Sequence, residues 1–379
     1  MKPEFLLTPE IAYLNHGSFG ACPRTVFNAY QDYQRELELE PVNFLQRHFP
    51  EKMQLARVKL AGFLHCHADQ IAFVRNATYG MNLVARSLPI GNGDTVLTTD
   101  HEYGAVDRMW QTLCSETGAK LKRVQIPLPV RCNQDLIDAI VEQIDSSVRV
   151  LTFSHITSAS SLRFPVEELV NVAAKAGIIS VIDGAHAPGQ ISLDLDRLNA
   201  DFYVGNCHKW LLSPKGAAFV HVAGKWTDHI RPPIVSWGNI SKGSNALLLE
   251  NEWQGTADIS ATLALADAIA FLENHDWFNE VIPNCTRLLN RATSCLLEIT
   301  GQHDIYGSAE LRSPQMASFL LPEGDHSGLH SRLFEEYQVE LPVFAAPQGN
   351  LFRISLQAYN TEEDITRLAA ALQDLLKDS

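Results

Sequence analysis

The chain of 379 residues lacks most features by which secreted proteins and nucleic-acid binders are recognised. Its seven cysteines are widely spaced and form no C-x-x-C pair, which argues against a disulfide framework or zinc knuckle and fits a reducing compartment. Lys and Arg number 30 against 44 Asp and Glu, which gives a net charge of −14. This acidic balance argues against sequence-independent binding to nucleic acid and against docking on an anionic membrane.

Long apolar runs and nucleotide-binding motifs are also missing. The most apolar stretch, residues 259–272, contains Asp267 and is shorter than the ~18 apolar residues that a membrane span needs. No P-loop occurs, and Gly91-Asn92-Gly93 lacks the third glycine of a dinucleotide fingerprint, which disfavours a nicotinamide-dependent oxidoreductase. The first residues show no secretory signal. We therefore expect a cytoplasmic protein with no nucleic-acid or membrane partner.

Short apolar segments alternate with helical segments over the first two thirds of the chain. The predicted strands are 71–74, 94–99, 120–126, 149–154, 178–183, 201–206 and 217–222. Such alternation is typical of an α/β domain with a mainly parallel, helix-covered sheet. We predict a large domain of this kind over residues 15–260.

Residues 261–379 show a different pattern, for which we predict a small α+β domain joined by residues 1–14. The expected elements are a helix pair over 259–299, a strand at 316–321, a helix at 326–337, strands at 339–344 and 351–356, and a helix from Thr361. A further long amphipathic helix is expected over Val42–Leu64, where apolar residues recur at helical spacing.

Two charged residues follow predicted strands, where open α/β sheets bind their ligands. Asp183 lies in VIDGAHAPGQ (181–190), and Lys209 lies in DFYVGNCHKWLLSPKG (201–216). Alone, the Asp would be a turn residue and the Lys a solvated one. Together they match the needs of a pyridoxal phosphate (PLP) enzyme: a Lys for the Schiff base and a carboxylate that keeps the pyridine nitrogen protonated.

In these segments the chain resembles a known family. The combination of DGAHAPG (183–189) with GNCHKWL (205–211) is similar to fold-type-I PLP-dependent enzymes of aminotransferase class V, and within it to the isopenicillin N epimerase-like group. The segments YLNHGSFGACP (13–23), LTTDHEYGAV (97–106) and FRISLQAYNTEED (352–364) resemble the same group. The resemblance implies a large PLP-binding domain, a small domain, and a homodimer with active sites near the subunit interface.

The resemblance also implies roles for the residues around the cofactor ring. Lys209 would bind PLP covalently and move the α-proton, and Asp183 would pair with the pyridine nitrogen. His186 would hydrogen-bond the 3-oxygen of the ring. Tyr103 falls where relatives place a His or an aromatic residue that stacks on the ring, a contact worth ~1 kcal/mol.

The phosphate of the cofactor is expected at a strand-to-helix connection. Ala77 and Thr78 would offer backbone N–H groups at a helix N-terminus and a hydroxyl, which suit a phosphate dianion. Asn206 and His208 match family positions around the same phosphate. Thr256 matches a Thr that relatives donate across the dimer interface, and a helix N-cap is its alternative interpretation.

Arg353 is the predicted partner of the substrate α-carboxylate, because a guanidinium fork can bind a carboxylate through two parallel hydrogen bonds. Asn15 and His16 match a loop that lines the substrate pocket in the family. Thr157 and Ser158 match, more weakly, a position near the ring oxygen. No metal site is predicted, since His65-Cys66-His67 reads as a helix end.

Three reactions remain open at this point. Group-transferring cysteine desulfurases carry a Cys before the C-terminal Arg, and residues 338–353 contain none, which disfavours a persulfide carrier but leaves a simple C–S lyase possible. We predict an epimerase or racemase, with a second acid opposite Lys209 such as Tyr103 or His16; the alternatives are a cysteine C–S lyase and a class V aminotransferase. A catalytically inactive dimer is disfavoured by the intact Lys209, Asp183 and Arg353.

Overall fold

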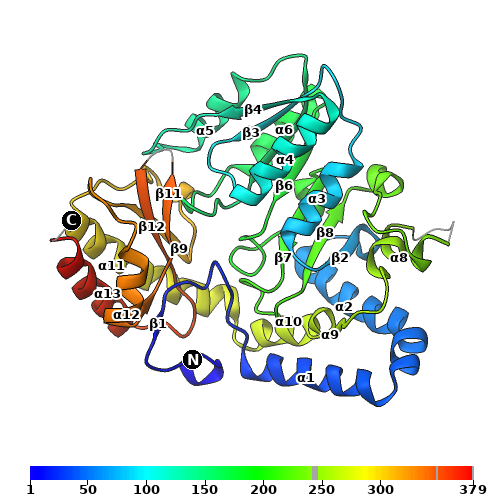
Figure 1. Ribbon diagram of the computed structural model, residues 1–379, viewed down its shortest axis with the longest axis horizontal. Coiled ribbons are helices and arrows are strands. Elements are labelled where there is room, and N and C mark those ends of the chain that lie inside the picture. Colours follow the sequence, from blue (N-terminus) through cyan, green and yellow to red (C-terminus); the bar gives the residue numbers. More distant parts are fainter. Residues whose placement is uncertain (241–245, 347–348, 378–379) are drawn as a thin grey trace.

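The structure is a computed structural model that describes residues 1–240, 246–346 and 349–377. Within these ranges the strands form three sheets (Figure 1). The largest has the order β2-β8-β7-β6-β5-β3-β4. Its strands are β2 (Ile71–Val74), β3 (Thr95–Thr99), β4 (Lys120–Val124), β5 (Val148–Ser154), β6 (Ile179–Asp183), β7 (Phe202–Asn206) and β8 (Ala218–Val222).

All neighbouring strands from β7 to β4 in this sheet run parallel, whereas β8 is antiparallel to both of its neighbours. The mainly parallel α/β sheet predicted from the sequence is therefore confirmed. The connecting helices that follow the strands are α3 (Ala77–Ser87), α4 (Gly104–Thr117), α5 (Asn133–Val141), α6 (Val166–Ala176) and the short α7 (Leu195–Leu198).

The central strands are buried on both faces, which explains their nearly continuous apolar sequences. Val150 and Val181 pack into one core with α3 and α4, and their neighbours Leu151 and Ile182 pack into a second core on the opposite face. Successive side chains of a strand point to opposite faces, so both cores draw on the same short segments. The site lies at the carboxyl ends of these strands.

A second group of elements lies beside the large sheet (Figure 1). It contains a sheet of order β11-β12-β9 and a two-stranded sheet of β1 with β10. The strands are β1 (Ala12–Tyr13), β9 (Met316–Leu320), β10 (Val339–Glu340), β11 (Val343–Ala346) and β12 (Gly349–Ser355), with helices α11 (Ile282–Thr300), α12 (Leu329–Tyr337) and α13 (Glu362–Leu375). The parallel pairing of β1 with β10 ties the N-terminal residues to this group.

Most of the remaining helices lie along one side of the molecule, whereas α8 (Ala246–Glu252) packs on β2 at the edge of the large sheet (Figure 1). The others are α1 (Arg24–Leu39), α2 (Phe49–Leu64), α9 (Ser260–Leu263) and α10 (Leu265–Asn274). Helices α1 and α2 both pack on α9 and α10. The division into domains at residue 260 remains a prediction.

Three predicted elements were wrong in detail. The strand expected at 339–344 is two strands in different sheets, because Pro342 has no N–H with which to continue a ladder. The helix expected over Val42–Leu64 begins with a π-helical stretch, Asn43–His48, and its α-helical part starts beside Pro50, which is tolerated in a first turn. The helix pair over 259–299 consists of shorter pieces. Within the described ranges, no helix combines the length and the apolar character that crossing a bilayer requires.

Candidate active site

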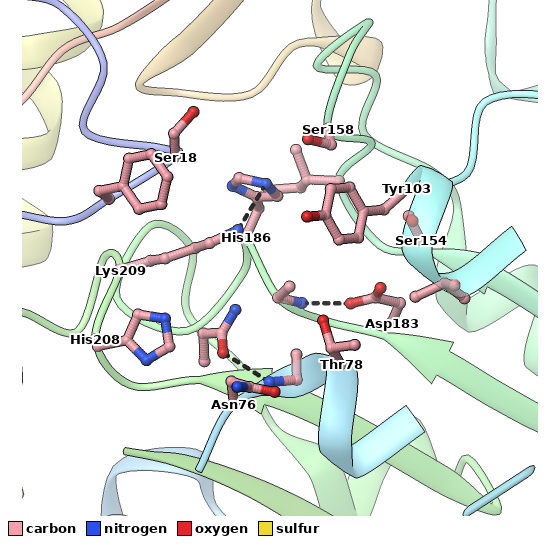
Figure 2. Close-up of a pocket in the computed structure, with 16 residues that line it drawn as sticks. Ser18, Asn76, Thr78, Tyr103, Ser154, Ser158, Asp183, His186, His208 and Lys209 are labelled. Atoms are coloured by element: carbon pink, nitrogen blue, oxygen red, sulfur yellow. Dashed lines mark hydrogen bonds between the residues drawn. The ribbon is translucent and has the colours of Figure 1, made fainter. Parts of the chain in front are cut away.

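A cavity of about 250 Å³ lies at the carboxyl ends of the parallel strands, next to the first turn of α3 (Figure 2). Ser154, Asp183 and Asn206, the last residues of β5, β6 and β7, all line it. We name it the Lys209 cavity. The predicted positions that line it are Ala77, Thr78, Tyr103, Ser158, Asp183, His186, Asn206, His208 and Lys209.

Lys209 presents an enclosed amine to this cavity, although part of its side chain is exposed. Burial of the amine, aided by the positive charge of Arg353, lowers the pKa of Lys209 to about 7. Removing an ammonium group from water disfavours its charged form. A large share of the amine is therefore uncharged at neutral pH, with a lone pair that can attack a carbonyl or take a proton.

Trp210 determines which nitrogen of His186 carries the proton. The indole Nε1–H, which can only donate, points at Nδ1 of His186 from 3.3 Å. Burial also holds the pKa of His186 well below its usual value, so the ring is neutral and its proton resides on Nε2. Nε2 lies 3.1 Å from Nζ of Lys209 and donates to the uncharged amine (Figure 2).

Asp183 is 4% exposed at the end of β6. Its Oδ1 accepts the backbone N–H of Ala185 at 2.9 Å. Burial nevertheless raises the pKa of Asp183 above its usual value, because an enclosed carboxylate loses its hydration. A cationic group placed against this carboxylate would favour its ionised form.

Helix α3 begins at the opposite end of the cavity from Tyr103 in the close-up, near Asn76 (Figure 2). Oδ1 of Asn76 caps the helix by accepting the N–H of Tyr79 at 2.8 Å. The N–H of Ala77, which we expected to face a phosphate, donates instead to Oδ1 of Asn206 at 2.9 Å. Thr78 brings its hydroxyl to the cavity wall. The helix N-terminus thus lies where the sequence predicted it, with the N–H groups of Ala77 and Tyr79 already used.

His208 lies at the same end of the cavity (Figure 2). Its Nδ1 donates to the carbonyl of Ala217 at 3.0 Å, which leaves Nε2 available to a ligand. Burial lowers the pKa of His208 to about 4, so the ring is neutral in the absence of an anion. A bound anion would favour its protonated form.

Arg353 is a buried cation on β12, and its partners line the Lys209 cavity. Nη1 donates to the carbonyl of Ser158 at 2.6 Å and Nη2 to Oγ of Ser18 at 2.8 Å. Burial lowers the pKa of Arg353 only to about 10, so it stays charged at neutral pH. Among the described residues no carboxylate forms an ion pair with it, and its Nε has no hydrogen-bond partner. A buried guanidinium of this kind is suited to an anionic ligand.

The N-terminal loop forms the wall behind Lys209. His16 is fully buried, and its Nε2 lies 3.1 Å from the carbonyl oxygen of Lys209. Burial lowers the pKa of His16 to about 3. Asn15 donates to Glu340 at 3.2 Å. The described lining of the cavity includes neither residue, so their role in substrate binding remains a prediction.

Thr256 lies apart from this cavity. It lines a second hollow together with Arg75 and Tyr79. Within one chain it therefore does not complete the Lys209 cavity. This position is compatible with the predicted donation of Thr256 to the site of a partner subunit, which remains a prediction.

The sequence matches one family over nearly its whole length. The family model of aminotransferase class-V covers residues 12–368. The chain belongs to aminotransferase class V. Its similar proteins include isopenicillin N epimerase of Amycolatopsis lactamdurans, which is 33% identical over 99% of this chain and 98% of its own. They also include an L-cysteine desulfhydrase of Arabidopsis thaliana, which is 27% identical over 97% of this chain and 88% of its own.

Solved structures support the fold. The cystine C–S lyase C-DES, in complex with cysteine persulfide, matches with a TM-score of 0.84 at 22% identity, over 97% of this chain and 98% of its own. A variant of C-DES with glycine covalently linked to its PLP cofactor gives the same TM-score at 20% identity. The predicted fold type I is therefore confirmed.

As a class V enzyme the protein uses PLP, and the residues of the cavity fit this cofactor. Lys209 offers the uncharged amine that a Schiff base requires. Asp183 offers a buried carboxylate that a protonated ring nitrogen would balance. The Nε2–H of His186 is a donor beside Lys209, as an oxygen on the ring needs. The N-terminus of α3 and His208 suit a phosphate.

Sequence reasoning on this class V enzyme missed several residues of the site. Ser18 and Phe19 line the cavity, whereas only the preceding Asn-His pair was expected there. Ser154 also lines the cavity and was not predicted, and its partner Glu102 was considered only as part of a zinc motif, which was rejected because Ala105 stands where the second His would be. Trp210 directly follows Lys209, and only the folded structure shows that its indole N–H reaches His186.

Proposed function

We propose that this protein is an amino-acid epimerase or racemase that acts on an amino acid or a small peptide-like amine. The observation that carries the proposal is the placement of Tyr103 and Lys209 on opposite sides of the cavity (Figure 2). Inversion at carbon requires one group that removes a proton and another that returns one from the opposite side. Of the two second acids suggested by the sequence, Tyr103 is favoured, because it lines the cavity and His16 is not part of the described lining.

Each residue has a task in this reaction. PLP, when bound, withdraws electrons from the substrate α-carbon and makes its proton acidic. Arg353 binds the α-carboxylate and so fixes the orientation of the substrate. The amine of Lys209 takes the α-proton, and the hydroxyl of Tyr103 supplies a proton to the other face. One proton leaves and one enters, so the reaction needs no oxidant or second substrate.

The curated relatives support this choice. Isopenicillin N epimerases of Amycolatopsis lactamdurans and Streptomyces clavuligerus are both 33% identical to this chain over 99% of its length. The relatives named cysteine desulfhydrases are 26–28% identical where they match nearly the whole chain.

The test is incubation of the holoenzyme with L- and D-amino acids in deuterated water. Inversion should place deuterium at the α-carbon of the product enantiomer, as seen by chiral chromatography and mass spectrometry. Tyr103→Phe should lose inversion while Lys209 still exchanges the α-proton with retention. Tyr337→Phe, which removes the hydroxyl of a tyrosine on α12, is the matched control. Exchange without inversion in the wild type, for every amino acid tested, would refute the proposal.

A cysteine C–S lyase is the second candidate. Residues 338–353 contain no Cys, so no second nucleophile in this segment would accept the sulfur. A C–S lyase does not need one, because Lys209 alone suffices for removal of the α-proton and loss of a β-thiol. The same incubation distinguishes it, because L-cysteine would yield pyruvate, ammonia and sulfide. A keto acid from half-transamination, with PLP converted to its amine form, would identify the third candidate, an aminotransferase.

We further propose that the protein is a cytoplasmic homodimer. The position of Thr256 outside the Lys209 cavity of its own chain supports a site completed by a partner subunit. The side chain of Trp237 is 78% exposed, and a partner subunit would cover this apolar side chain. Light scattering should give twice the chain mass, and Thr256→Val should weaken PLP binding. A monomer with full PLP affinity would contradict this.

A further inference from the structure

A second carboxyl group lies beside Asp183. Glu102 follows β3 and turns back over the strand ends, where its Oε1 accepts the hydroxyl of Thr99 at 2.6 Å. Its Oε2 accepts the hydroxyl of Ser154, also at 2.6 Å. The Cα register of β5 and β6 places Ser154 directly beside Asp183, as the close-up shows (Figure 2). Glu102 follows β3 and Asp183 ends β6, so the two acids lie at the same edge of the sheet with β5 between their strands.

The hydrogen bonds that Glu102 accepts favour the ionised form of its carboxyl group. Oγ1 of Thr99 already accepts the backbone N–H of His101 at 3.3 Å, so its own hydrogen is directed to Glu102. Both oxygens of Glu102 thus accept short hydrogen bonds from hydroxyls, which favours the charged form. Part of the side chain is exposed, but the carboxyl group is enclosed.

In the part of the chain that the structure describes, no Lys, Arg or His side chain forms an ion pair with Glu102. Burial raises the pKa of Glu102 to about 7, and the charge of Asp183 contributes to the rise. On its own loop, His101 bonds the carbonyl of Ile126 and lies 3.8 Å from Asp100. Asp183, which lines the Lys209 cavity, and the enclosed Glu102, which bonds Ser154 of the same lining, together favour a ligand that brings positive charge to this side.

We propose that Glu102 is a positioning residue for the ring nitrogen of PLP: its carboxylate, held by Thr99 and Ser154, acts with Asp183 to keep a proton on that nitrogen. The inference rests on PLP binding and not on which reaction follows. Asp183 would contact the ring nitrogen directly, whereas Glu102 would act through the field of its charge. The same charge makes the protonated nitrogen easier to maintain as the pH rises.

The first test is the PLP affinity of the apoprotein between pH 5.5 and 8.5, followed by fluorescence. Glu102→Gln keeps the shape of the side chain and removes its charge. It should bind PLP on the order of tenfold more weakly at pH 8, which corresponds to a change of one pKa unit. The difference should shrink toward pH 5.5, where Glu102 of the wild type is protonated. Glu142→Gln, an exposed change at the end of α5, should follow the wild type.

The second test measures the protonation of the PLP ring nitrogen directly. With ¹⁵N-labelled PLP bound, the NMR shift of the ring nitrogen should show loss of its proton at a lower pH in Glu102→Gln than in the wild type. Ser154→Ala, which keeps the acid and removes one donor to it, should give an intermediate value. A structural role alone would not move this shift.

The possible results distinguish an error in the assignment of PLP from an error in the role of Glu102. If the wild-type apoprotein does not bind PLP, the cofactor assignment itself is wrong. If wild type, Glu102→Gln and Ser154→Ala bind PLP with the same pH dependence and show the same ring-nitrogen titration, the role of Glu102 is overturned while the cofactor assignment stands. Melting curves of the apoproteins establish that each variant is folded before it is compared.

Discussion

The indole N–H of Trp210 donates to Nδ1 of His186, and this contact fixes the tautomer of the ring that lies beside the amine of Lys209. Because Nδ1 must accept, the neutral ring has its proton on Nε2 and directs it to the amine of Lys209, which has to be uncharged to accept it. Both side chains lose charge through burial. Trp210 thus determines that His186 presents an N–H donor to an amine that burial has left largely uncharged.

Trp210→Phe should therefore change the tautomer of His186. Without the indole donor, Nδ1 can hold the proton and Nε2 no longer donates to Lys209. Loss of one hydrogen bond of ~1 kcal/mol predicts a rate lower by roughly tenfold or less. ¹⁵N NMR of labelled histidine reports the tautomer directly. The same tautomer in wild type and variant would contradict the assignment. Trp226→Phe, which removes an indole donor to Asp201 outside the described cavity lining, is the control.

The stability of the apoprotein should depend on pH through Lys209. Its pKa is about 7 in the folded chain and ~10.4 in an unfolded one, so between these values the unfolded chain binds the extra proton. The free energy of unfolding should consequently rise with pH in this window, by up to about 1.4 kcal/mol per pH unit from this group. Lys209→Met should lack this contribution. Urea unfolding of both apoproteins at pH 7, 8 and 9 measures the difference, and parallel curves would disprove it.

Arg353→Met should weaken binding of the substrate carboxylate. A charge-assisted hydrogen bond contributes about 1.5–3 kcal/mol, so KM for an amino acid should rise roughly 10- to 100-fold. The PLP affinity should change much less, because Arg353 is not part of the described cavity lining. Arg149→Met, at an exposed position of β5, is the control. An unchanged KM would remove Arg353 from substrate binding.

Gly20→Ala should disturb the backbone at Lys209. A Cβ at Gly20 would lie 2.4 Å from the carbonyl oxygen of His208 and 2.7 Å from that of Lys209. Since backbone cannot yield as a side chain does, we expect a loss of about 1–3 kcal/mol in unfolding free energy, together with weaker PLP binding.

Gly62→Ala is the matched control for this substitution. Gly62 lies inside α2, and a Cβ there would meet nothing within 4 Å. This change should stabilise the protein by about 0.5–1 kcal/mol, because alanine loses less backbone entropy in a helix. Urea unfolding of both variants checks the prediction, and equal effects on stability would contradict it.

Most of the large sheet could be predicted from the sequence, because its central strands are short and buried on both faces. The segment 71–74 is the strand β2 itself, and 178–183 differs from β6 by one residue. Pairing partners were harder to predict. Residues 339–344 read as one apolar strand, and only Pro342 and the competing β1 divide them between two sheets.

The positions of the site residues were likewise predictable only in part. Asp183 and Lys209 follow apolar strands, so their placement at the carboxyl edge of a parallel sheet follows from local pattern. His16 could not be placed in this way, because a short loop takes its position from what it packs against, which here is the carbonyl of Lys209. The role of Glu102 could not be predicted from its neighbours in sequence, because it depends on hydroxyl groups at the ends of two strands.

The sequence by itself determined the class of chemistry: an amine and a carboxylate at neighbouring strand ends, with an arginine far along the chain. The tertiary structure alone decided how these groups are tuned. It brings Arg353 to Ser18, which is 335 residues away, and it encloses Lys209 so that its amine loses charge. The charge state, tautomer and orientation of the site side chains depend on burial and on neighbours from distant segments. Their residue types and their positions at strand ends, in contrast, follow from the local sequence.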